Sequence, residues 1–242
     1  MKKNAVISLK NITKEYTLRG HRPTLVERLL GKSKLEKVEA LHNLSIDIFP
    51  GQKVGIVGSN GSGKTTFLKI ISNISQPTSG EMKVVGRVVS VIDLEAGFHP
   101  DLSGRENIMI NGMILGMTKK EILSKMNEIL SFADIGRFID EPMFTYSKGM
   151  KLRLGFAIAI SSDPDIFLLD EMIAVGDKEF KAKTAKKVAS FLKQGKVVVI
   201  ASHLIDFIGL SCKRIVWLEK GKILADGGKE VVKKYKKYKS SL

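Results

Sequence analysis

The stretch Gly58-Ser59-Asn60-Gly61-Ser62-Gly63-Lys64-Thr65-Thr66 decides how this chain folds. It fits the phosphate-binding loop pattern G-x-x-x-x-G-K-[ST], and an apolar run at 54–57 and a helical pattern at 67–71 flank it as the motif requires. Glycines let the backbone curl around phosphates with its N–H groups facing them, and the following helix points its positive end at the anion. We expect Lys64 to reach the β- and γ-phosphates and the Thr65 hydroxyl to bind Mg²⁺. The alternative, a glycine-rich turn beside a chance Lys-Thr pair, leaves the flanking elements unexplained.

Size and composition indicate one large α/β domain with room for a subdomain. The chain has 242 residues, of which 43% are hydrophobic, which is enough for a sizeable core. No apolar run approaches the roughly 18–20 residues of a membrane-spanning helix, and none suits a signal peptide, so we expect the chain in the cytoplasm. Cys212 is the only cysteine, which excludes an intrachain disulfide, and we expect a buried structural thiol.

The formal net charge of +15 suits polyanions such as nucleic acid, anionic lipid headgroups or nucleotides. No nucleic-acid-binding module is visible, and general solubility explains the charge as well as a role at an anionic membrane surface does. The tail at 229–239 predicts a basic helix with two valines and two tyrosines on one side. A solvated helix packed through those four side chains is slightly favoured over one that binds lipid.

Two further apolar runs end in polar residues at one expected sheet edge. The run 166–169 is followed by Asp170 and Glu171, and the run 196–200 is followed shortly by His203. Such runs are typical of buried parallel strands, whose carboxyl ends bind ligands. Asp170 can therefore meet Mg²⁺, and Glu171 can polarise the attacking water as a general base. A lone histidine at this edge is usually structural, but beside a nucleotide His203 can contact the γ-phosphate and hold that water.

Periodicity predicts the remaining elements. We expect strands at 5–10, 41–48, 81–85, 88–92, 213–218 and 222–226, and helices at 104–116, 119–132, 150–161 and 177–193. Two of these helices begin with capping-box spacing, at Ser103 with Glu106 and at Thr118 with Glu121.

A basic connection at 17–39 interrupts the sheet pattern. Connections of this length are uncommon unless they are functional or disordered, and a partner contact and a surface loop both remain open. Tyr16, just before it, is either a core residue or an exposed ring that stacks on a purine base.

The order of five segments along the chain indicates a family: 58–66, Tyr146-Ser147-Lys148-Gly149-Met150, 166–171, Ala174-Val175-Gly176-Asp177 and His203. They resemble, in turn, the Walker A, signature, Walker B, D-loop and H-loop segments of ABC-transporter ATPases, over nearly the whole chain. The resemblance implies an α/β fold with a P-loop NTPase (RecA-like) core, an antiparallel β subdomain and an inserted α-helical subdomain at about 94–160. All of 1–242 would form one such domain, with ATP and Mg²⁺ as its ligands.

Other segments resemble a subgroup of that family. Residues 86–88, 95–102 and 104–107, together with the Tyr-Ser-Lys-Gly-Met signature, are similar to those of the ATPase subunits of bacterial polysaccharide exporters. These export O-antigen, capsule or teichoic acid chains made on a lipid carrier, and the insert after Tyr16 also resembles this group. Some members carry a C-terminal glycan-binding domain, which we do not expect here because the chain ends at Leu242.

The resemblance assigns roles to individual residues. Tyr16 would stack on adenine, and Ser147 and Gly149 would bind the γ-phosphate of ATP held by a second copy of the chain. Asp177 would lie at the interface of that homodimer. ATP would thus be sandwiched between two copies, and its hydrolysis would release them, a two-state switch for a membrane partner to read.

Two positions depart from the family pattern. Glu95 stands where most ABC ATPases have a glutamine that touches Mg²⁺ and water, so its part in binding the metal is open. Lys148 occupies the third position of the signature, where it can alter contact with the nucleotide or with the membrane partner.

We therefore expect the ATP-hydrolysing subunit of a transporter that exports a lipid-linked polysaccharide, bound through an integral membrane subunit to the cytoplasmic face of the membrane. The alternatives are an ATPase for another exported substrate, such as a lipid or drug, a soluble ABC protein acting on nucleic acid, and a silent nucleotide-binding regulator. Nucleic acid is not the expected partner, because such proteins usually carry two ATPase units or long inserted coiled coils. Intact Lys64, Asp170, Glu171 and His203 argue against the regulator.

Overall fold

The computed structural model describes residues 4–18, 36–92, 94–170 and 178–241. The predictions for Glu171 and Asp177, and most of the 17–39 connection, lie outside these residues. The strands are β1 (Ile7–Leu18), β2 (Glu36–Ile48), β3 (Lys53–Val57), β4 (Ser79–Val84), β5 (Val88–Ser90), β6 (Ile166–Leu169), β7 (Val197–Ala201), β8 (Arg214–Glu219) and β9 (Lys222–Gly227). The α-helices are α2 (Lys64–Ile71), α3 (Gly104–Ile114), α4 (Lys119–Ala133), α5 (Lys148–Ser161), α6 (Lys178–Lys193), α7 (Ile205–Ser211) and α8 (Lys229–Lys239).

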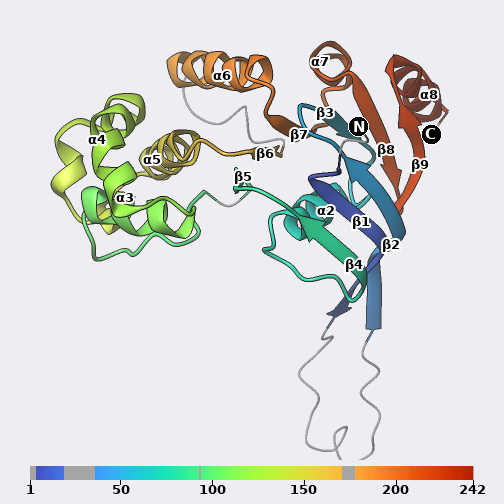
Figure 1. The fold of residues 1–242 in the computed structure, drawn as a ribbon, viewed down its shortest axis with the longest axis horizontal. Coiled ribbons are helices and arrows are strands. Elements are labelled where there is room, and N and C mark those ends of the chain that lie inside the picture. Colours follow the sequence, from blue (N-terminus) through green and yellow to red (C-terminus); the bar gives the residue numbers. More distant parts are fainter. Residues whose placement is uncertain (1–3, 19–35, 93, 171–177, 242) are drawn as a thin grey trace, which may run out of the picture.

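Two sheets organise these elements (Figure 1). The larger has the order β5-β6-β7-β3-β8-β9, and its strands run parallel except for β9, which pairs antiparallel with β8. The smaller is antiparallel, with the order β2-β1-β4. Strand β3, which leads into the phosphate loop, thus lies in the middle of the parallel sheet between β7 and β8.

The apolar runs seen in the sequence are buried in two layers. Helix α2 packs in one core with side chains from both sheets, including Phe67 of the helix, Leu9 of β1 and Val199 of β7. The opposite face of the large sheet is covered by α6, α7 and α8 and by part of α5. Burial on both faces is the reason that β6 and β7 read as unbroken apolar runs.

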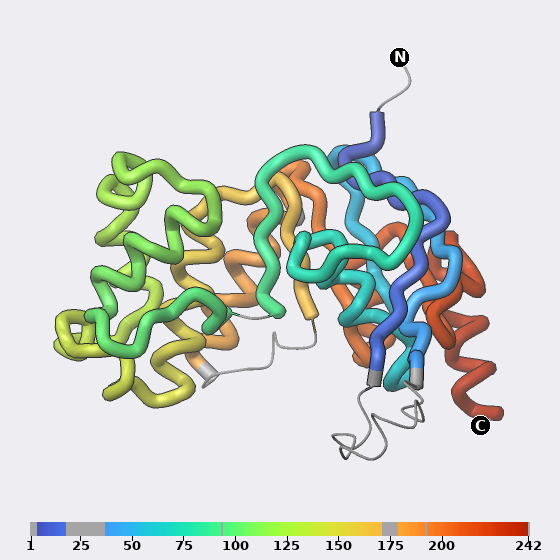
Figure 2. The backbone as a smooth tube through the Cα atoms, turned by 90° about the horizontal axis from the view of Figure 1, so that it is seen from below, coloured from blue at the N-terminus to red at the C-terminus, as the bar shows by residue number. Residues whose placement is uncertain are grey.

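A separate helical layer is formed by α3, α4 and α5 around its own apolar core. Figure 2 shows this layer to one side of the sheets. Both predicted capping boxes are present: the Ser103 and Thr118 side chains accept from the backbone N–H groups of Glu106 and Glu121, whose carboxylates accept in return.

The predicted boundaries of several elements were wrong. The expected strands at 5–10 and 41–48 are longer, because β1 continues to Leu18 and β2 begins at Glu36, with Tyr16 paired to Val38. In this extension Ile12 is buried, whereas Tyr16 and Val38 are exposed and most other residues are polar, so the apolar alternation is too weak to mark a strand in the sequence. Helix α5 begins at Lys148 rather than 150, because Ser147 caps it. Strand β5 ends at Ser90 rather than 92.

The C-terminal segment packs as the favoured interpretation predicted. Tyr235 of α8 is buried, and the rings of Tyr235 and Tyr238 lie 5.5 and 5.0 Å from the Trp217 ring. Cys212 is buried beneath the large sheet, as expected, and burial raises the pKa of its thiol to about 12. Within the described residues, no helix is long and apolar enough to cross a membrane.

Candidate nucleotide-binding site

The phosphate loop connects β3 to α2 through backbone that requires glycine. Gly63 has φ of +103°, a left-handed conformation that side chains with a Cβ rarely adopt. At Gly58 the reason is space, because a Cβ there would lie 2.0 Å from the Leu218 carbonyl oxygen. The loop is therefore packed directly against β8.

Lys64 is held across the loop. Its side chain is only 7% exposed, and its ammonium donates to the carbonyls of Gly58 at 3.0 Å and Ser59 at 2.9 Å. The ammonium therefore lies inside the curve of the loop, at the N-terminus of α2. The helix dipole and the charge of the ammonium both favour binding of an anion there.

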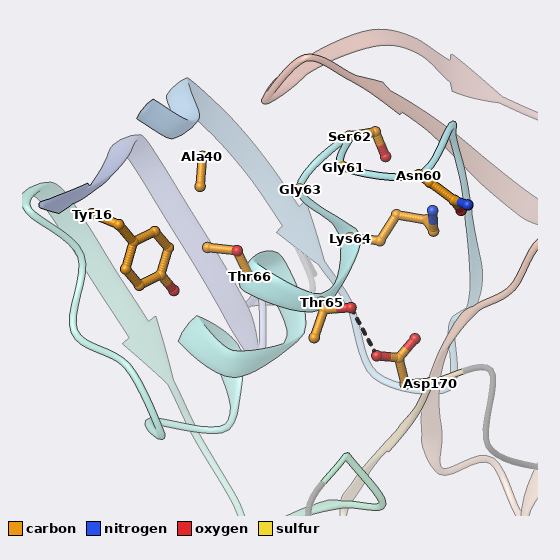
Figure 3. Close-up of a pocket in the computed structure, with 10 residues that line it drawn as sticks. All are labelled: Tyr16, Ala40, Asn60, Gly61, Ser62, Gly63, Lys64, Thr65, Thr66 and Asp170. Carbon is orange, nitrogen blue, oxygen red and sulfur yellow. Dashed lines mark hydrogen bonds between the residues drawn. The ribbon is translucent and has the colours of Figure 1, made fainter. Parts of the chain in front are cut away.

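Asp170 meets the phosphate loop as its place after β6 predicted. The Thr65 hydroxyl donates to an Asp170 carboxylate oxygen at 3.0 Å, across 105 residues of sequence (Figure 3). Hydroxyl and carboxylate oxygens are ligands that Mg²⁺ prefers, and Mg²⁺ usually takes only one or two protein ligands beside substrate phosphates. Among the described residues there is no cluster of three acidic, histidine or cysteine side chains that would make a self-sufficient metal cage. The pair therefore fits Mg²⁺ carried in with a nucleotide.

Tyr16 lines the same pocket from the antiparallel sheet. Its ring is 38% exposed, so it is not the core residue that the sequence left open. The pocket has a volume of about 660 Å³ and is lined by Tyr16, Ala40, Asn60, Gly61, Ser62, Gly63, Lys64, Thr65, Thr66 and Asp170. Figure 3 shows Tyr16 and Asp170 on opposite sides of the loop and the first turn of α2. That spacing suits a ligand with an aromatic part at one end and phosphates at the other.

Six of the predicted site residues that the structure describes do not line this pocket, and two of them, Gly58 and Ser59, belong to the phosphate loop itself. Ser147 and Gly149 are exposed at the start of α5, where the Ser147 hydroxyl accepts from the Met150 N–H at 3.2 Å. His203 is exposed just beyond β7, and Glu95 is half-buried in the turn that follows β5. Their assigned roles stay predictions.

Tyr146 fixes the first position of the signature segment. Its hydroxyl donates to the Phe138 carbonyl at 2.6 Å, and burial, followed by the charge of Asp140, raises its pKa to about 12. The neutral hydroxyl thus anchors the start of α5, and with it Ser147.

Sequence reasoning missed three residues around the loop. Ala40 lies on the unpredicted part of β2, and the Lys14 ammonium lies 5.1 Å from the Tyr16 ring centre, where a cation restrains the ring. Glu219 is a buried carboxylate that contacts Ser59 of the loop. An acid directly after an apolar strand was a visible signal for Glu219, but nothing in the sequence pointed to its target.

Comparison with known proteins agrees with this geometry. The profile of the ABC transporter family matches residues 41–174. An O-antigen export system ATP-binding protein of Klebsiella pneumoniae is 37% identical over 239 residues, which cover 96% of this chain and 97% of that protein. A protein of the same name from Myxococcus xanthus is 45% identical, and a teichoic acids export ATP-binding protein of Enterococcus faecalis is 40% identical. The matches cover 89% and 98% of this chain but only 52% and 54%, about half, of those two relatives.

Solved structures agree on the fold. A dimeric ATP-binding cassette in a post-hydrolysis state with ADP and phosphate superposes with a TM-score of 0.71 at 25% identity, over 92% of this chain and 98% of that one. The ATP-binding subunit of an ABC transporter superposes with a TM-score of 0.74 at 17% identity, over 96% and 93% of the two chains. Together with the Walker A loop, the Thr65–Asp170 contact and the relatives above, these likenesses establish that the chain belongs to the ABC transporter family and has the ABC ATPase fold.

Proposed function

We propose that this chain hydrolyses ATP to drive export of a lipid-linked polysaccharide, of the O-antigen, capsule or teichoic acid kind, across the cytoplasmic membrane. The observation that carries the proposal is the match over 97% of a Klebsiella O-antigen export protein, in a chain whose pocket joins a phosphate loop to Asp170. Teichoic acid export proteins among the relatives support the same chemical class, a long glycan on a lipid carrier.

Nucleotide binding would begin in the pocket described above. Tyr16, steadied by Lys14, would stack on the adenine ring, and the N–H groups of the loop would face the phosphates. Lys64 would exchange its two neutral carbonyl acceptors for the β- and γ-phosphate oxygens, and charged acceptors make the stronger hydrogen bonds.

Thr65 and Asp170 would hold Mg²⁺, whose oxygen preference their 3.0 Å contact fits. The bound ion would neutralise charge on the phosphates. Glu95 is the further candidate near the metal. Glu171, the residue after Asp170, would take a proton from the attacking water, and His203 would hold that water.

A second copy of the chain would complete the site. Ser147 and Gly149 are exposed at the N-terminus of a 14-residue helix, a place that favours an anion. They do not line the pocket of their own chain, so a γ-phosphate presented by a partner copy is the anion that fits, and Asp177 would lie at that interface. The dimeric cassette among the structural relatives supports this arrangement. An integral membrane subunit would read out closure and opening of the dimer, which would place this chain peripherally at the cytoplasmic face.

The mechanism can be tested by trapping the dimer. Glu171→Gln should bind ATP without hydrolysing it, so light scattering should report a dimer with Mg-ATP and a monomer without it. Lys64→Ala in the same background is the matched control, and it should stay monomeric because it lacks the phosphate contact. A monomer of Glu171→Gln despite measured ATP binding would refute self-assembly of the sandwich by this chain alone.

The export role needs a test in cells. Replacing the chromosomal codon for Lys64 with one for alanine should leave lipid-linked glycan inside the cell and strip it from the surface. Unchanged surface glycan would refute polysaccharide export. Salt-sensitive binding to nucleic acid without recruitment to membranes would instead favour the soluble nucleic-acid class.

A further inference from the structure

A buried carboxylate stands behind the phosphate loop. Glu219, at the end of β8, is 7% exposed, and both of its oxygens face Ser59 of the loop. The Ser59 hydroxyl donates to Oε1 in a short hydrogen bond, and the Ser59 N–H donates to Oε2 at 3.4 Å. The Ser59 N–H is thereby directed to the rear of the loop, away from the pocket.

The same carboxylate reaches the C-terminal helix. Oε2 of Glu219 also accepts from the Trp217 indole N–H at 3.4 Å. The Trp217 ring packs against Tyr235 and Tyr238 of α8, with ring centres 5.5 and 5.0 Å apart. A continuous set of contacts therefore runs from the phosphate loop through Glu219 and Trp217 to α8.

The turn that carries Glu219 cannot shift independently of the loop. The Gly221 N–H donates to the Ser62 carbonyl at 3.0 Å, and Gly58 packs directly on the Leu218 carbonyl. Close packing of this kind transmits displacement, because neither side has space to absorb it. A change in the geometry of the loop should therefore displace Glu219.

A negative charge next to a triphosphate site repels the phosphates, so it is unfavourable unless its hydrogen bonds offset that repulsion. Here the carboxylate accepts from two donors of the half-buried Ser59 and from the buried indole N–H of Trp217, which would otherwise lose this acceptor. We propose that Glu219 is a positioning residue, which presets the phosphate loop through Ser59 and passes the state of the loop to Trp217 and α8. The inference rests on the proposed nucleotide site and extends it to regulation from the C-terminal helix.

The chain contains its own reporter for this contact. Trp217 is the single tryptophan of the 242 residues, so its fluorescence should change when Mg-ADP fills the loop. Glu219→Leu removes all three hydrogen bonds and should weaken ADP binding about ten-fold, the equivalent of one hydrogen bond to a charged group. It should also abolish the fluorescence change.

Glu219→Gln separates hydrogen bonding from charge. Its amide oxygen can accept from the Ser59 and Trp217 N–H groups while its NH₂ donates to the Ser59 hydroxyl oxygen. We expect ADP affinity within about three-fold of wild type and a retained fluorescence change. Ser59→Ala, a smaller change than Glu219→Leu, should give a partial loss of affinity, and the double variant should be less than additive.

Glu230→Gln is the matched control. Glu230 lies at the start of α8, accepts from the Gly228 N–H at 2.6 Å and makes no hydrogen bond to the loop or Trp217 among the described residues. It should leave both ADP affinity and the fluorescence change intact. Circular dichroism and thermal melting separate misfolding from a binding defect in every variant.

The outcomes distinguish the two proposals. Wild-type affinity in a folded Glu219→Leu, or an equal loss in Glu230→Gln, would overturn the positioning role while leaving the nucleotide site standing. A lower melting temperature without a change in affinity would reduce Glu219 to a structural residue. Failure of the wild-type chain to bind ADP would overturn the nucleotide site itself, and the positioning role with it.

Discussion

Arg87 connects the core of the molecule to its helical layer, and Arg87→Leu should destabilise the protein by removing that connection. The residue immediately precedes β5, and its guanidinium donates to the carbonyl of Ser162, just beyond α5, and to the carbonyl of Gly116, between α3 and α4, at 2.6 Å. One rigid fork thus links a strand edge to two places in the helical layer, a geometry that a planar guanidinium supports.

The expected cost follows from the burial of each acceptor. Ser162 is fully buried, so losing a hydrogen bond from a charged donor there costs about 1.5–3 kcal/mol. Gly116 is exposed and its carbonyl can be rehydrated, which limits that loss to under about 1 kcal/mol. The more distant pair with Glu121, at 3.8 Å, is open to solvent and is left out of the sum. Leucine retains most of the apolar stem, so Arg87→Leu should lower the free energy of unfolding by about 1.5–4 kcal/mol.

Urea unfolding measures this cost directly. The midpoint should fall while the slope m stays constant, because the surface exposed on unfolding hardly changes. Arg105→Leu is the matched control, since Arg105 pairs with Asp140 at 2.6 Å but the two side chains are 45% and 66% exposed. Such exposed pairs contribute below about 1 kcal/mol. Equal midpoints for the two variants would refute the idea that Arg87 stabilises the protein mainly through its hydrogen bonds to carbonyls, one of them buried, and not through charge pairing.

Three shorter predictions follow. Asp170→Asn should still bind ADP without metal but should lose the gain in affinity that Mg²⁺ provides, and titration calorimetry with and without Mg²⁺ checks this; an undiminished gain would remove Asp170 from the metal site. Burial raises the pKa of Cys212 to about 12, so the unfolded chain loses this proton first and stability falls as pH rises from about 9 towards 12. Cys212→Ala should therefore start less stable but lose less on the way to pH 10.5, and a gap in melting temperature that stays constant would contradict the assignment. Ser103→Ala should cost about 1 kcal/mol at pH 7. Because hydrogen bonds from Ser103 lower the pKa of Glu106, their stabilisation is present above the ordinary carboxyl pKa and is lost as pH falls through the lowered value, so the cost of Ser103→Ala should shrink in acid.

The sequence was enough to predict the phosphate loop and its meeting with Asp170. The loop motif has a fixed spacing, and the rule that parallel strands bring their carboxyl ends to one edge placed Asp170 beside Thr65 without any coordinates. The extension of β1 and β2 was not predictable, because its few apolar side chains are interrupted by polar ones and give only a weak alternation. The sequence therefore did not predict that Ala40 lines the pocket. It also left open whether Tyr16 lies in the core, and the structure places it in the pocket.

Glu219 marks the limit of motif-based reasoning about this site. It lies 160 residues from Ser59 in the sequence, and its effect depends on a contact behind the loop that no spacing rule describes. Loop residues that face the phosphates are constrained by the chemistry of phosphate, whereas residues behind the loop need only hold it in shape. On the proposal made above, substitutions in α8 that shift Trp217 would change nucleotide affinity while every motif residue stays intact. The C-terminal helix would then influence the nucleotide site through its packing on Trp217, without touching the nucleotide.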